Sequence, residues 1–132
     1  MNVVPSITAI DHAAFDRLLS VEFPEADSEL DAEDRALLHI EMAAVARSTS
    51  RAIEAGDAAE VARHLSVMEK VLTSAASDVE NAVYVSYLEN VFLWDQRPAF
   101  VAVRAGLPPR LARGLFELEE HFAMLAGHAA DT

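Results

Sequence analysis

Apolar residues return at intervals of three and four along most of this chain, and that spacing is typical of one face of an α-helix. The stretch 58–75 shows it most regularly, and residues 11–21 and about 31–55 carry similar stripes. The pattern therefore predicts amphipathic helices over 11–21, from Ser28 or Asp31 to about Ala55, and over 58–75.

Residues with strong local preferences support these boundaries. Asp11 and Asp57 are typical N-cap residues, and Gly56 is a typical C-terminal stop. Phe23-Pro24 ends the first helix, because a residue before proline avoids the helical region. We therefore expect short connections between consecutive helices.

A fourth helix is predicted over residues 79–94, where apolar side chains occur on nearly every side. A helix of this kind is usually central and buried. A β-strand is the alternative over residues 83–87, which are β-branched and aromatic. We reject it because the apolar stretch is too long and has no partner strand.

Prolines and glycines delimit the C-terminal part of the chain. Pro98 opens a short helix that Gly106 stops. A last helix begins at residues 108–109 and ends at Gly127, and Gly114 inside it indicates a close contact with another helix. The sequence thus predicts an all-α fold, a compact bundle of five to six helices in antiparallel α-hairpins. A repeat-like stack of hairpins is the alternative arrangement. We expect one domain over 1–132, loosely ordered at 1–9 and 128–132.

Composition narrows the function. The 132 residues include 22 acids and 10 basic residues, a net charge of -12, and no cysteine. Such a charge disfavours binding to nucleic acid or an anionic membrane and favours a basic partner. No leader segment or membrane-spanning stretch is evident, so we expect a cytoplasmic protein.

Motifs for catalysis or metal binding are missing. No histidine follows a glutamate at the Glu-x-x-His spacing of di-iron bundles, and His-Glu-x-x-His is absent. The chain also lacks Gly-x-Ser-x-Gly and a glycine-rich phosphate loop. We therefore expect no enzyme activity, no cofactor and no metal site.

Negative charge is concentrated early in the chain. Residues 11–41 contain ten acids and only two arginines. A helix N-terminus favours some of these acids, but an anionic docking surface for a basic protein accounts for more of them. The predicted charged contacts are Glu29, Asp31, Glu33, Asp34 and Glu41.

A second candidate surface lies on the fourth helix. Tyrosine and tryptophan are common anchors of interfaces, although aromatic residues are also common in cores. The candidates here are Tyr84, Tyr87, Glu89, Trp94 and Asp95. The arginines of the acid-free segment from Arg97 to Arg113 pair within the fold, pair between copies in a homodimer, or bind an acidic partner.

One segment carries a family resemblance. Residues 85–90, Val-Ser-Tyr-Leu-Glu-Asn, resemble part of a family of small helical bacterial proteins, some of them encoded near polymorphic toxins. Phe23-Pro24 and the turn over 54–57 agree with it. The resemblance implies an all-α fold and an immunity-type protein, which binds and neutralises a cognate toxin. The alternative is a helical scaffold or regulatory module that self-associates.

Overall fold

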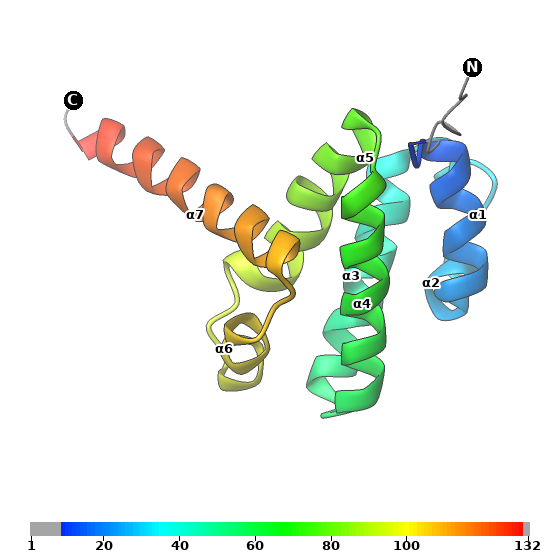
Figure 1. Ribbon diagram of the computed structural model, residues 1–132, viewed down its shortest axis with the longest axis horizontal. Coiled ribbons are helices and arrows are strands. Elements are labelled where there is room, and N and C mark those ends of the chain that lie inside the picture. Colours follow the sequence, from blue (N-terminus) through cyan, green and yellow to red (C-terminus); the bar gives the residue numbers. More distant parts are fainter. Residues whose placement is uncertain (1–8, 131–132) are drawn as a thin grey trace, which may run out of the picture.

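The computed structural model describes residues 9–130, with side chains through Gly127, and this part of the chain is helical apart from short connections (Figure 1). No β-strand occurs within it, so the all-α prediction is confirmed. The α-helices are α1 (His12–Glu22), α2 (Pro24–Ser28), α3 (Leu38–Glu54), α4 (Ala58–Ser74), α5 (Ser77–Ala82), α6 (Pro98–Ala105) and α7 (Pro109–Ala130). A 3₁₀ turn, η1 (Asp34–Ala36), precedes α3, and a π-helix, η2 (Val83–Leu93), continues α5.

The second helix does not start at Ser28 or Asp31 as predicted. The short helix α2 and the 3₁₀ turn η1 precede it, so the described residues contain seven α-helices and not five to six. The backbone N–H of Asp34 donates to Asp31 Oδ1 at 2.8 Å, and that of Asp31 donates to Asp34 Oδ2 at 3.2 Å. Such side chain to backbone bonds compete with helical hydrogen bonding. The long helix α3 therefore begins only at Leu38.

The predicted helix caps and the predicted glycine stop at Gly56 are confirmed. Asp11 accepts a hydrogen bond from the N–H of Ala14 and caps α1, and Asp57 accepts one from Glu60 and caps α4. Gly56 has a φ of 68°, a conformation that glycine adopts without strain. Helix α6 has the predicted bounds.

The end of α7 differs from the prediction. The helix continues through Gly127 to Ala130, because a glycine inside a helix costs only about 1 kcal/mol and here meets no obstacle. Of the predicted loose ends, residues 1–8 and 131–132 lie outside the described residues. The backbone of residues 128–130 belongs to α7.

The helices pack around α3 and η2. Helices α3 and α4 form an antiparallel hairpin, α1 and α2 lie on one side of it, and η2 joins it to α7 on the other (Figure 1). The distal end of α7 points away from the body of the molecule. One apolar core joins all these layers, and its largest fully buried side chains include Phe15, Phe23, Met42, Met68, Tyr87, Phe92 and Leu111.

The start of the described chain is tied to this core. The N–H of Ile10 donates to Ser74 O at 2.7 Å, and the N–H of Ala76 donates to Ile10 O at 2.9 Å. These bonds hold the entry to α1 against the turn between α4 and α5. None of the described helices combines the length and apolar character that crossing a membrane requires.

Candidate partner-binding surface

Half of the acids between α1 and α3 are already paired with arginines. Arg51 contacts Glu25 at 2.8 Å and Glu29 at 2.7 Å, and Arg47 also contacts Glu29, at 3.2 Å. These ion pairs attach α2 to the outer side of α3. Glu29 therefore lies at the surface as predicted, but its charge is largely compensated inside the molecule.

Three acids are left at the tip of the connection between α2 and α3. Asp31 and Glu33 are exposed, Asp34 is half-buried, and none of the three forms an ion pair with a described residue. Leu37 and Ile40, which follow directly, are 54% and 38% exposed. We call these five residues, Asp31, Glu33, Asp34, Leu37 and Ile40, the acidic patch. It combines uncompensated charge with apolar surface, as protein interfaces do.

The prediction of a surface contact is wrong for Glu41, which is fully buried between α1 and α3. His12 Nε2–H donates to its Oε1. Burial, followed by the nearby Asp16 carboxylate, raises the pKa of Glu41 to about 7, while hydrogen bonding to Glu41 lowers the pKa of Asp16. Glu41 Oε2 and Asp16 Oδ1 are both buried and have no other hydrogen-bond partner, although Arg35 Nη1 lies 3.7 Å from Asp16 Oδ1. A proton held by Glu41 and donated to Asp16 satisfies both oxygens.

Tyr87 is the second wrong prediction, because it lies wholly in the core. Its hydroxyl and His64 Nδ1 both hydrogen-bond to Thr49 Oγ1, each at 2.9 Å. The other ring nitrogen of His64 lies 3.0 Å from Glu60 Oε1. Burial lowers the pKa of His64, and the hydrogen bonds from Arg63 lower the pKa of Glu60 to about 2. This chain of polar groups is structural, since only its outer end reaches the surface.

The π-helix explains why the predicted aromatic face is split. Hydrogen bonds from residue i to i+5 place more residues in each turn than an α-helix does. Exposed and half-buried residues of this segment consequently return every four to five positions, at 80–81, 84–85, 89–90 and 94. Trp94 is exposed, Tyr84 and Glu89 are half-buried, and Tyr87 points inward. Asp95 contacts the Arg97 side chain at 2.7 Å, so its charge is compensated.

Further hydrogen bonds connect the π-helix and the residues that follow it to their surroundings. His39 Nδ1 lies 2.7 Å from Ser86 Oγ, which places the exposed Val85 beside the start of α3 and near the acidic patch. Arg104 donates to the carbonyls of Phe92 and Asp95, and a cation at those carbonyls stabilises a helix C-terminus. π-Helical turns occur frequently at functional sites, which makes this segment part of the candidate surface.

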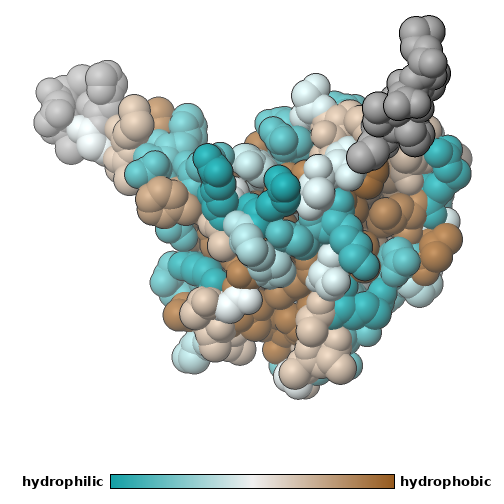
Figure 2. All heavy atoms as spheres, viewed as in Figure 1, coloured by the Kyte–Doolittle hydropathy of each residue, from teal (hydrophilic) through white to brown (hydrophobic). Residues whose placement is uncertain are grey.

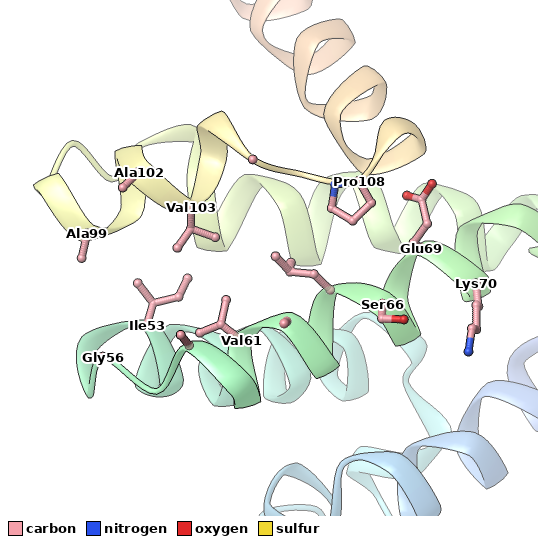
Figure 3. A pocket seen from close by; sticks show the side chains of 14 residues that line it. Ile53, Gly56, Val61, Ser66, Glu69, Lys70, Ala99, Ala102, Val103 and Pro108 are labelled. Carbon is pink, nitrogen blue, oxygen red and sulfur yellow. The ribbon is translucent and has the colours of Figure 1, made fainter.

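Sequence reasoning missed a groove between α4 and α6. It has a volume of about 670 Å³ and opens on the face seen in Figure 2, where apolar residues fill the hollow between the two helices. Ile53, Val61 and Val103 project into it, whereas Glu69 and Lys70 stand at one end (Figure 3). Its apolar residues come from the facing sides of α4 and α6 and from Ile53 of α3, so no motif could reveal the space left between them.

Within the described residues, no group of three or more histidine, aspartate or glutamate side chains is arranged to hold a metal ion. Residues 16–123 match the model of the family described as Domain of unknown function (DUF7674). The chain belongs to this family. No curated protein and no solved structure matches it.

The DUF7674 stretch contains the acidic patch, the π-helix and the groove. His12 precedes the stretch and Leu125 follows it. The family assignment therefore covers the candidate surface as a whole, and the description of the family leaves the function to be argued from that surface.

Proposed function

We propose that this DUF7674 protein is an immunity-type protein that binds and neutralises a basic toxin domain through its acidic patch. The observation that carries the proposal is the combination of uncompensated acids with exposed Leu37 and Ile40 at one projecting connection. Charge complementarity speeds the encounter with a basic partner, and the apolar pair supplies surface that becomes buried in a complex.

The distribution of charge supports a basic partner. Residues 1–94 hold seventeen acids against six basic residues. Such an excess of negative charge attracts cationic proteins and repels nucleic acid. Residues 85–90 resemble part of a family with members encoded near toxins, which favours a toxin as the basic partner. The hydrogen bond between His39 and Ser86 connects this segment to the start of α3, next to the acidic patch.

The first experiment tests neutralisation. The protein encoded by the neighbouring gene is expressed alone and together with this chain, and cell growth and copurification are measured. We expect the neighbour to inhibit growth alone, to be tolerated with this chain, and to copurify with it. A neighbour that is harmless alone, or that does not copurify, contradicts the proposal.

The second experiment tests the surface with matched charge changes. Glu33→Lys reverses an acid of the patch that has no ion pair with a described residue, and Glu120→Lys reverses an exposed acid on α7. We expect Glu33→Lys to lower the association rate about tenfold at low salt and Glu120→Lys to have a much smaller effect. Equal effects of the two variants argue against the patch as the interface.

The double variant Asp31→Asn with Asp34→Asn removes charge and keeps oxygen acceptors for the two backbone N–H groups. It therefore tests charge without unfolding the connection. Slower association with an unchanged circular dichroism spectrum supports the proposed role, whereas wild-type kinetics count against it.

A further inference from the structure

An apolar stripe on α7 continues past the body of the molecule. Leu111, Leu115, Leu118, Phe122 and Leu125 follow one another at intervals of four and three, the repeat of a coiled-coil seam. The first three are buried against the body. Phe122 is half-buried, and Leu125 is 52% exposed. Figure 1 shows this end of α7 pointing away from the other helices.

A single aromatic residue covers part of the exposed stretch. Trp94, which follows the π-helix, stacks edge-on against Phe122 with ring centroids 5.1 Å apart, yet it is itself 63% exposed. A shallow hollow lined by Leu93, Trp94, Phe122 and Leu125 lies between the two elements. We call Trp94, Phe122 and Leu125 the α7 patch. Contiguous apolar surface of this kind marks an interaction site.

The charge around the α7 patch indicates what covers it. Of the three acids on α7 near the patch, Glu119 lies 4.0 Å from Arg104 and Glu117 lies 3.4 Å from Arg113, so two of their charges are compensated. Residues 1–94, in contrast, hold seventeen acids against six basic residues. Two copies of an acidic protein repel each other through most of their surfaces. The α7 end is the region where they can meet while their acidic ends stay apart.

The shape of the patch favours the same occupant. A seam with alternating spacings of three and four packs against another helix that carries the same repeat, and α7 of a second copy presents such a helix. In a two-fold pair each α7 patch faces the other, which is the usual arrangement of a homodimer. Such a pair leaves both acidic patches free.

We propose that two copies of this chain form a homodimer through the α7 patch, with the ends of their α7 helices packed against each other. The contact area is small compared with a standard protein interface, so the dimer depends on concentration. The proposal stands apart from the proposed function, because toxin binding takes place at the other end of the molecule.

The test measures molar mass by analytical ultracentrifugation of the full chain from about 1 µM to about 1 mM. We expect the mass to rise from monomer to dimer. Leu125→Glu places a charge in the patch and raises the dimer dissociation constant at least about tenfold. Val21→Glu makes the same kind of change at an exposed residue of α1 and leaves the dissociation constant within about twofold.

A monomer at every concentration overturns the proposal, as does a dimer that Leu125→Glu leaves intact. Circular dichroism of both variants shows whether they keep the wild-type helix content, which is expected because both residues are exposed.

Because the sequence has no cysteine, a second readout needs only one substitution. Leu125→Cys is expected to give a covalent dimer with a short bismaleimide crosslinker, and Val21→Cys is expected to stay monomeric. Equal crosslinking of the two variants contradicts a contact at α7.

Discussion

Helices α1 and α2 are attached to α3 partly through charged side chains, whereas α7 is attached to η2 almost entirely through apolar ones. Both regions bury apolar residues, Phe15 and Leu19 in the first and Leu111 and Leu115 in the second. The region of α1 and α2 also contains the buried Glu41 with its partners His12 and Asp16, and the ion pairs of Arg35 and Arg51. We therefore expect pH and salt to act mainly on the end with α1 and α2, and packing changes to act mainly on the end with α7.

Enlarging Gly114 is expected to give the largest loss of stability. A Cβ at this position would lie 3.0 Å from both Leu88 Cδ1 and Tyr84 Cε1. Gly114→Val forces α7 away from η2 and lowers the free energy of unfolding by about 2–3 kcal/mol, measured by urea denaturation. The sequence predicted a close helix contact at Gly114, and a loss of this size would show that the contact limits the side chain that the position accepts.

Gly127→Val is the matched control, because nothing lies within 4 Å of a Cβ at Gly127. We expect its effect to stay within about 0.5 kcal/mol. Similar effects of the two variants would mean that packing against η2 does not restrict the residue at position 114.

Replacing Glu41 is expected to change how stability depends on pH. The pKa of Glu41 in the folded protein is raised to about 7 from its usual value of 4.5, so the folded state binds more protons than the unfolded state between these values. Its contribution to stability is therefore complete below pH 4.5 and is lost as the pH rises through 7. Relative to Glu41→Gln, the wild type should lose about 1–2 kcal/mol between pH 5 and pH 8.

Thermal melts of both proteins across this pH range provide the measurement. His64 has a lowered pKa and acts in the opposite direction, but it is present in both proteins and cancels in the difference. Glu33→Gln, at an exposed carboxyl, should follow the wild type. A constant difference between wild type and Glu41→Gln would show that Glu41 stays ionised when folded.

The sequence predicted those features that depend on neighbouring residues. Asp11, Asp57 and Gly56 act within one turn of the chain, so their roles as caps and stops were readable. Pro98 and Gly106 bound α6 for the same reason. The all-α class follows from such local signals added along the chain.

Features that depend on distant residues were not predictable. Glu41 was read as a surface acid because its partners, His12 and Asp16, lie on another helix. Tyr87 was placed on a face by counting 3.6 residues per turn, a period that does not apply in a π-helix. Of the candidate site, the acids at residues 31–34 were predicted, whereas Leu37, Ile40 and the groove became visible only in three dimensions.

Removing Glu69 tests a charged contact that positions the start of α7. Its two carboxylate oxygens each accept a hydrogen bond at 3.0 Å, from the N–H groups of Arg110 and Leu111. Glu69→Ala leaves these N–H groups at the helix N-terminus without their acceptor and costs about 1 kcal/mol. Glu69→Gln keeps one acceptor oxygen and should cost less, as measured by urea denaturation. Two equally stable variants would indicate that charge matters more than the hydrogen bonds.

A small effect is expected at Arg51, whose ion pairs with Glu25 and Glu29 are at the surface. Arg51→Met keeps an apolar stem and should cost about 0.5 kcal/mol or less at low salt, and the loss should vanish near 1 M salt because the charges are then screened. Arg113→Met removes a single ion pair on α7, at 3.4 Å, and should cost less still. A loss from Arg51→Met that persists at high salt would show that packing, and not charge, attaches α2 to α3. The difference between the two ends of the molecule would then rest on Glu41 and on the ion pairs of Arg35.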